Sequence, residues 1–221
     1  MMTGERTRVF LVDDHPLVRE SLASLIAQQE DLEVCGEAES AAAALAAIGP
    51  AKPDVAIVDL SLGGRSGLEL IRDLKVMFPK IATLVLSMHD EEIYAERALR
   101  SGARGYIMKR EATKKVIAAI RRVKDGKLYV SDRMAARLTE RLVVGGPEAD
   151  RSPGAVLSDR ELEVFRLFGL GRGTGEVAEA LHLSSKTVQT YCARIKEKLG
   201  VTTLTQMMRE AVRWVEEEAR R

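Results

Sequence analysis

Short apolar runs alternate with longer amphipathic segments through the first half of the chain. Four of these runs end in a polar residue: Val9–Val12 before Asp13, Val55–Val58 before Asp59, Thr83–Leu86 before Ser87 and Tyr106–Met108 before Lys109. A further run, Leu32–Gly36, ends without such a residue. Unbroken β-rich runs separated by helix-length segments are typical of a parallel sheet that helices cover on both faces. All strands of such a sheet end at one edge, where ligands bind.

The segments between the runs carry apolar residues at helical spacing, as Val116, Ile120 and Val123 illustrate. The predicted helices are Pro16–Gln29, Ser40–Ile48, Gly67–Met77, Glu91–Ser101 and Thr113–Lys124. The pattern therefore predicts five repeats of strand and helix. We expect residues 6–130 to form an α/β domain with a doubly wound, five-stranded parallel sheet.

The alternation of strands and helices ends after residue 130. The pattern predicts one more helix near Arg133–Val144, followed by a stretch rich in Gly, Pro and acids, Gly145–Gly154. That composition is typical of a flexible linker, so residues 131–154 are predicted to be a linker with a helix. Two domains are expected, because 221 residues are long for one ordinary α/β domain.

Residues 155–221 are predicted to form a second, smaller, all-α domain of four short helices. Ser158 and Glu161 form a capping box for a helix to about Leu170. The other predicted helices begin at caps as well: Thr174 for a helix to Leu181, Ser184 for one to Leu199, and Thr203 for one that runs towards Trp214. Short helices with tight joints predict a helix-turn-helix unit.

Charge and cysteine content narrow the class of protein. The net charge is only +1. The positive charge is local, because the stretch 181–213 holds six basic residues against Glu197 and Glu210. Cys35 and Cys192 have no metal-binding or redox spacing, which indicates a reducing compartment. The longest apolar stretch is far too short to span a membrane and no signal peptide is visible, so we expect a soluble, cytoplasmic protein without a membrane partner.

The polar residues at the strand ends predict one acidic crevice. Asp13, Asp14 and Asp59 supply the carboxylates that, with a backbone carbonyl, can hold Mg²⁺ beside a phosphoryl group. Phosphoryl transfer also needs donors that stabilise charge on the phosphoryl oxygens, and Lys109 and Ser87 suit that role. A single acid at a strand end would only solvate the sheet edge, whereas the ordered set favours a site.

These residues resemble the receiver domain of two-component response regulators, over roughly Arg8 to Tyr129. The resemblance implies a flavodoxin-like receiver whose Asp59 is phosphorylated by a sensor histidine kinase. It also implies roles for the other positions: Asp13, Asp14 and Ser61 with Asp59 at the Mg²⁺ ion, Ser87 as the switch hydroxyl, Lys109 as the phosphoryl-binding lysine and Tyr106 as the switch aromatic. In this interpretation the chain is no turnover enzyme, although it is expected to dephosphorylate itself.

Two enzyme interpretations compete with this one. His15 could act as a general base beside Asp59, or His89 could assist a nucleophile near Ser87, but a loop histidine beside acids is more often solvated. A magnesium phosphatase of the haloacid dehalogenase type also uses a strand-end aspartate. That family expects a second aspartate two residues further on, where this chain has Ser61.

The second domain resembles the LuxR-type helix-turn-helix of the NarL/FixJ group. Four segments carry the resemblance: Leu157–Val164, Val177–Leu181, Ser184–Val188 and Ile195–Leu199. On the helix that begins after Ser184, a stripe at three- and four-residue steps should face the core: Val188, Cys192, Ile195 and Leu199. The remaining side chains are the predicted contacts to double-stranded DNA: Lys186, Thr187, Gln189, Thr190, Arg194, Lys196 and Lys198.

Gln189 stands where the family commonly has Lys. Gln reads adenine and Lys or Arg read guanine, so the base preference should differ from that of better-known relatives. An adaptor that no longer binds DNA is a further alternative, suggested by the uncharged Gln189 and Ala193.

The last predicted helix carries an apolar stripe of core and surface residues: Leu204, Met207, Met208, Ala211, Val212 and Val215. The resemblance assigns part of the stripe to a homodimer that forms on phosphorylation. It also adds RNA polymerase to the expected partners. The interpretation is therefore a transcription regulator controlled by phosphorylation of Asp59.

Overall fold

The computed structural model describes residues 6–62, 66–144 and 153–219. The chain divides into two compact units, Met1–Val144 and Gly145–Arg221, which are described separately below. Residues 145–152 of the predicted linker lie outside the described residues. No helix in the described ranges is both long and apolar enough to cross a membrane.

The first unit contains the predicted parallel sheet. Its strands are β1 (Thr7–Val12), β2 (Leu32–Ala38), β3 (Val55–Val58), β4 (Ala82–Ser87) and β5 (Gly105–Met108). Their order in the sheet is β2-β1-β3-β4-β5, and every neighbouring pair is parallel. The chain reverses its direction across the sheet between β1 and β3, so the ligand crevice is expected at the carboxyl ends of these two strands.

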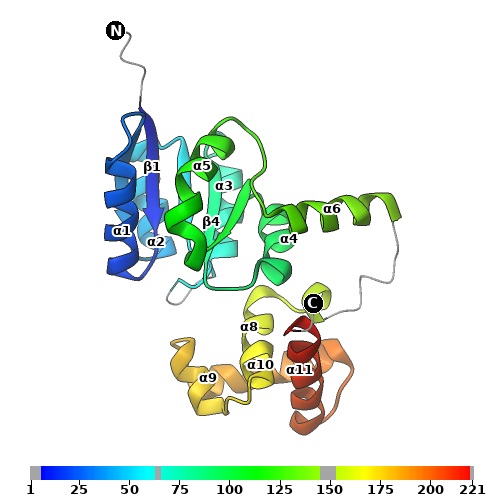
Figure 1. Ribbon diagram of the computed structural model, residues 1–221. Helices are drawn as coiled ribbons and strands as arrows, with labels where there is room; N and C mark the ends of the chain where they lie inside the picture. Colours follow the sequence, from blue (N-terminus) through cyan, green and yellow to red (C-terminus); the bar gives the residue numbers. More distant parts are fainter. Residues whose placement is uncertain (1–5, 63–65, 145–152, 220–221) are drawn as a thin grey trace. The chain divides into compact units, whose positions relative to one another are not determined.

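Helices cover both faces of the sheet (Figure 1). They are α1 (Pro16–Ala27), α2 (Ala41–Ala51), α3 (Gly67–Met77), α4 (Glu91–Ser101) and α5 (Ala112–Lys124). α1 and α5 pack together on one face, and α3 packs between α2 and α4 on the other. The central strands are buried throughout because both faces are covered. The predicted α/β architecture is confirmed, with helix ends that differ by at most three residues from those predicted.

Gly67, the first residue of α3, packs directly against the end of β3. A Cβ atom at this position would lie 2.1 Å from the backbone oxygen of Asp59. The Gly67 N–H donates to the carbonyl of Leu60 at 2.9 Å. The absence of a side chain therefore lets α3 begin close behind the residue that follows β3.

The chain adds a short bridge to the β5 edge before it leaves the sheet. The Tyr129 carbonyl accepts the Tyr106 N–H at 2.8 Å, and the Tyr129 N–H donates to Arg104 at 2.9 Å. Helix α6 (Asp132–Val144) follows at once and packs against α4, and both lie on the right of the first unit in Figure 1. The predicted helix near Arg133–Val144 is thus confirmed, and it belongs to the first compact unit.

The second unit is entirely helical within the described residues. Its helices are α7 (Pro153–Val156), α8 (Asp159–Gly169), α9 (Thr174–Ala180), α10 (Ser185–Leu199) and α11 (Leu204–Ala219). α8 packs against α9, α10 and α11. The shared core is apolar: Leu162, Phe165, Phe168, Val177, Val188, Ile195, Met207, Ala211 and Trp214.

Two details of this unit differ from the sequence prediction. The capping box of Ser158 and Glu161 is present, but Thr174 is not the cap of α9. Gly173 holds that place, since its N–H donates to the Glu176 carboxylate at 2.8 Å, and Thr174 is the first helical residue. The short α7 was not predicted. It begins at Pro153, whose fixed φ suits a first helical turn.

Candidate functional site

Three carboxylates converge at the carboxyl ends of β1 and β3. One ligand atom from each of Asp13, Asp14, His15 and Asp59 can be chosen so that all of them lie within 4.8 Å of one another. Asp13 and Asp59 are almost fully buried, with 3% and 2% of their surface exposed. The parallel topology thus brings together the acidic side chains that the sequence predicts to meet at the strand ends.

Lys109 brings a positive charge to the same place from the end of β5. Its Nζ lies 2.6 Å from Oδ2 of Asp13 and 2.7 Å from Oδ2 of Asp59. Burial raises the pKa of Asp59 to about 6, and the Lys109 ammonium opposes that shift. Burial by itself would lower the pKa of Lys109, but the neighbouring Asp59 and Asp13 raise it. These charged side chains therefore form a compact cluster with more acid than base.

The donor set suits a hard divalent cation. Among the described residues, Oδ1 of Asp59 is buried without a hydrogen-bond partner, and such an orphaned oxygen is costly unless a cation or ligand group reaches it. Carboxylate oxygens are the ligands that Mg²⁺ takes. The hydroxyl of Ser61, the fourth predicted metal ligand, lies 2.8 Å from Nε2 of His89.

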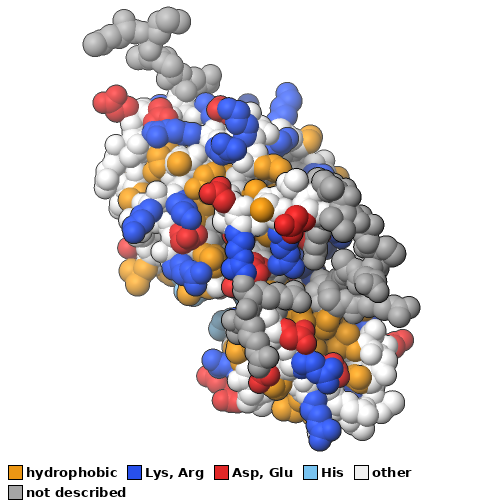
Figure 2. Space-filling view, turned by 45° about the vertical axis from the view of Figure 1, so that its right-hand side comes forward, with side chains coloured by type: hydrophobic (Ala, Val, Ile, Leu, Met, Phe, Trp, Pro, Cys, Tyr) orange, Lys and Arg blue, Asp and Glu red, His pale blue; other side chains and the backbone are white. Residues whose placement is uncertain are grey.

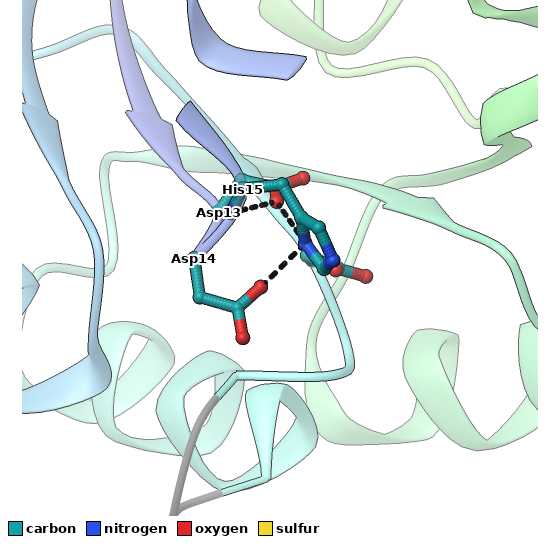
Figure 3. Close-up of side chains that lie close together, drawn as sticks. Asp13, Asp14 and His15 are labelled. Carbon is teal, nitrogen blue, oxygen red and sulfur yellow. Dashed lines mark hydrogen bonds and ion pairs between the residues drawn. The ribbon is translucent and has the colours of Figure 1, made fainter. Parts of the chain in front are cut away.

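His15 lies closer to the acids than its sequence context indicates. Figure 3 shows its ring beside the carboxylates of Asp13 and Asp14. Nδ1 is 2.7 Å from Oδ1 of Asp14 and 3.1 Å from Oδ1 of Asp13. The ring is exposed, as expected for a loop histidine, with 63% of the side chain accessible. It nevertheless contacts both acids of the predicted metal pair.

Ser87, at the end of β4, is fully buried. Its Oγ accepts the His89 N–H at 3.2 Å. The hydroxyl of buried Tyr106 donates to the His89 carbonyl at 2.9 Å. Burial raises the pKa of Tyr106 well above its usual value, and a hydrogen bond with Ser87 opposes the shift. Backbone atoms of the β4–α4 loop therefore connect the two predicted switch side chains.

His89 makes contacts that sequence reasoning does not predict. Its ring contacts the Ser61 hydroxyl and packs on Tyr94, with ring centroids 4.6 Å apart. The signal available in the sequence is its place two residues after Ser87. That spacing alone cannot reveal the bond to Ser61.

On α10, the predicted division between core and surface is largely confirmed. Val188, Cys192 and Ile195 are buried, whereas Leu199 is only partly buried. The predicted contacts that stand exposed are Lys186, Gln189, Thr190, Arg194 and Lys198. Thr187 and Lys196 are half-buried. Basic and acidic side chains are interspersed on the face of the protein that Figure 2 shows.

Lys198 has an acidic partner within its own domain. Its Nζ lies 2.7 Å from Oε2 of Glu161, a residue with 3% of its surface exposed. The same oxygen accepts the Ser158 N–H at 2.7 Å. Burial by itself would raise the pKa of Glu161, but the bonds from Lys198 and Ser158 lower it. One carboxylate thus caps α8 and anchors the end of α10.

Family models match both units. The model of the response regulator receiver domain matches residues 9–121. The model of bacterial regulatory proteins of the luxR family matches residues 155–211. The oxygen regulatory protein NreC of Staphylococcus carnosus (strain TM300) is 34% identical over 210 residues, which cover 93% of this chain and 97% of that protein.

Solved structures give the same result. RcsB of Salmonella typhimurium has a TM-score of 0.65 and 27% identity, covering 96% of this chain and 99% of that chain. A LuxR-family response regulator from Aurantimonas sp. SI85-9A1 has a TM-score of 0.58 and 31% identity. The match covers 63% of this chain and 99% of that chain. The phosphatase and adaptor alternatives are not favoured by these matches. This protein belongs to the NarL/FixJ family of response regulators, which join a receiver domain to a LuxR-type DNA-binding domain.

Proposed function

We propose that Asp59 is the residue through which a sensor histidine kinase controls this transcription regulator. The observation that carries the proposal is the orphaned, buried Oδ1 of Asp59 beside Lys109 and the acids of β1. An oxygen without a partner is free to form a new bond. The other carboxylate oxygen, Oδ2, is already engaged by Lys109 at 2.7 Å.

The phosphoryl group is transferred to Oδ1 of Asp59. A bond forms from Asp59 to phosphorus as the bond from phosphorus to the donor imidazole nitrogen breaks, and the electron pair of that bond stays on the imidazole. Mg²⁺, held by Asp13, Asp14, Asp59 and the Ser61 carbonyl, would neutralise charge on the phosphoryl oxygens. Lys109 and Ser87 bind those oxygens as an ammonium and a hydroxyl. Water later cleaves the acyl phosphate, which returns the carboxylate and inorganic phosphate.

The test uses a small phosphoryl donor with Mg²⁺. We expect mass spectrometry to show one phosphoryl group per chain, mapped to Asp59 after reduction of the acyl phosphate, and release of inorganic phosphate as the adduct decays. The Asp59→Asn variant should remain unlabelled. A label of equal yield on another aspartate of that variant would contradict the assignment.

For the second unit, we propose that α10 reads the major groove. Lys186, Gln189, Thr190 and Arg194 are exposed on one helix, as a recognition helix requires. The relative RcsB has been solved bound to a promoter, P1flhDC, in the presence of a phosphomimetic, which supports the same activity here. Gln189→Ala should cost about 1–3 kcal/mol at one base pair per half-site if its amide reads adenine. Equal losses on all single-base variants of the site would contradict this role.

We also propose that phosphorylation promotes a homodimer on DNA. One recognition helix covers few base pairs, so linking two half-sites about 10 bp apart raises affinity. Leu204 and Val212 of α11 are exposed apolar residues, with 42% and 38% of their surface accessible. Sedimentation with and without phosphorylation and DNA tests the proposal, and a monomer on DNA in both states would contradict it.

A further inference from the structure

Helix α6, which leads towards the DNA-binding unit, is held to the first turn of α4 by polar contacts. The Ser131 N–H donates to Oε1 of Glu91 at 2.8 Å, and Glu91 is buried with 8% of its surface exposed. The Ser131 hydroxyl accepts the Met134 N–H at 3.2 Å, as an N-cap of α6 does. The bond that Ser131 donates to Glu91 therefore holds the N-cap residue of α6 to α4.

Two arginines of α6, one helical turn apart, hold the next acid of α4. Arg133 lies 2.8 Å from Oε1 of Glu92, and Arg137 lies 3.6 Å from Oε2. Arg137 also donates to the Glu92 carbonyl at 3.4 Å. Met134, between the arginines, has 1% of its surface exposed. We call the contacts of Glu91 and Glu92 with Ser131, Arg133 and Arg137 the α4–α6 latch.

The latch lies next to the switch residues of the receiver. Three residues separate Ser87 from Glu91, and the His89 backbone between them bonds Ser87 on one side and Tyr106 on the other. Tyr106 is also bonded through its N–H to Tyr129, two residues before Ser131. The His89 backbone thus connects Ser87 and Tyr106 to the α4 end of the latch, and Tyr129 connects Tyr106 to the α6 end.

We propose that phosphorylation of Asp59 opens the α4–α6 latch and frees α6 from the receiver. The proposal rests on the proposed function, since it needs the phosphoryl group at Asp59. When the Ser87 hydroxyl turns to the phosphoryl oxygens, its bond with the His89 N–H breaks and the loop before α4 moves. Glu91 and Glu92 then leave Ser131 and the two arginines. A released α6 lengthens the tether of the DNA-binding unit, which lets two copies reach two half-sites.

The experiment is hydrogen exchange by mass spectrometry on the full chain, read in peptides from residues 131–140. In the unphosphorylated protein, Glu92→Arg should raise exchange there about fivefold, because two partly exposed ion pairs become repulsions. Glu92→Arg combined with Arg133→Glu and Arg137→Glu should restore the slow exchange. Glu20→Arg, an equal charge change on exposed α1, is the matched control and should leave these peptides unchanged.

Phosphorylation of the unsubstituted protein should raise exchange in the same peptides by a similar factor. It should add little to Glu92→Arg, in which the latch is already open. Phosphorylated protein with unchanged exchange in α6 would overturn this proposal alone. A chain that carries no phosphoryl group at Asp59 would overturn the proposed function as well, and the adduct mass in the same spectra separates the two outcomes. Slow exchange in Glu92→Arg would show that the ion pairs do not hold α6.

Discussion

The ammonium group of Lys109 lies 2.7 Å from Oδ2 of Asp59, although 50 residues separate the two in the sequence. This proximity arises because β3 and β5 both end at the same edge of the sheet. Lys109 reaches Asp13 of β1 at 2.6 Å as well. One side chain thus ties together the ends of three strands and offsets the charge of two buried acids.

Removal of the Lys109 ammonium should destabilise the receiver, and Mg²⁺ should restore part of the lost stability. In Lys109→Met, Asp13 and Asp59 stay buried without their cation, and the free energy of unfolding should fall by about 3–5 kcal/mol in the presence of a chelator. Millimolar Mg²⁺ should recover part of the loss, because it supplies positive charge to the same oxygens. Urea unfolding followed by far-UV circular dichroism measures both values. Equal losses with and without Mg²⁺ would mean that the metal does not bind at these acids.

Asp14→Ala tests the acid pair more directly. Asp14 is partly exposed, with 26% of its side chain accessible, so its loss should leave the fold intact. A hard cation that loses a carboxylate should bind about tenfold more weakly, or worse. Calorimetric titration with Mg²⁺ gives the affinity. Glu37→Ala, near the end of β2, serves as the control, and an unchanged affinity in Asp14→Ala would exclude this carboxylate from the site.

The lysines of α10 should separate into two classes in DNA binding. Lys186→Met should weaken binding to every sequence and reduce the slope of log K against log salt by about 0.9 for each phosphate that the variant no longer neutralises. Lys198 is paired with Glu161 at 2.7 Å, so Lys198→Met should leave the slope unchanged. Because that pair anchors the end of α10, its loss should reduce the ratio of specific to non-specific affinity. Titrations at several salt concentrations measure both quantities. A slope reduced equally in the two variants would assign Lys198 to the phosphates.

The Glu161–Lys198 pair should also make the second unit sensitive to acid. The pKa of Glu161 is lowered in the folded state from 4.5. Its ionised form therefore stabilises the fold above about pH 4.5, and that contribution is lost as the pH falls through the lower, folded pKa. Lys198→Met should cost about 1–2 kcal/mol at neutral pH and flatten the acid dependence, whereas exposed Lys186→Met should do neither. The single tryptophan, Trp214, reports unfolding of this unit by fluorescence.

The sheet and its helices could be predicted because their signals are local. A strand such as Val55–Val58 is apolar throughout since both of its faces are buried. The approach of Asp13, Asp59 and Lys109 followed from topology, since parallel strands end at one edge. The capping box of Ser158 and Glu161 was equally visible, because it lies within four consecutive residues.

Pairings between distant segments could not be predicted in the same way. Lys198 looks like any other lysine on α10, and its partner Glu161 lies 37 residues away on α8. The bond of His89 to Ser61 also depends on two loops whose paths no periodicity describes. The cap of α9 was misassigned because Gly173 has no side chain to signal it, and Glu176 supplies the bond instead.

The bridge that Tyr129 adds to β5 determines how short a stable receiver fragment can be. A chain that ends at Lys124 would keep all five strands but leave the Tyr106 N–H and the Arg104 carbonyl without the partners they have in Tyr129. Unpaired groups along an edge strand are a template for pairing with other chains. A soluble, monomeric receiver fragment must therefore extend past Tyr129. Because Ser131 and α6 follow directly, such a fragment ends at the start of the helix that we propose phosphorylation releases.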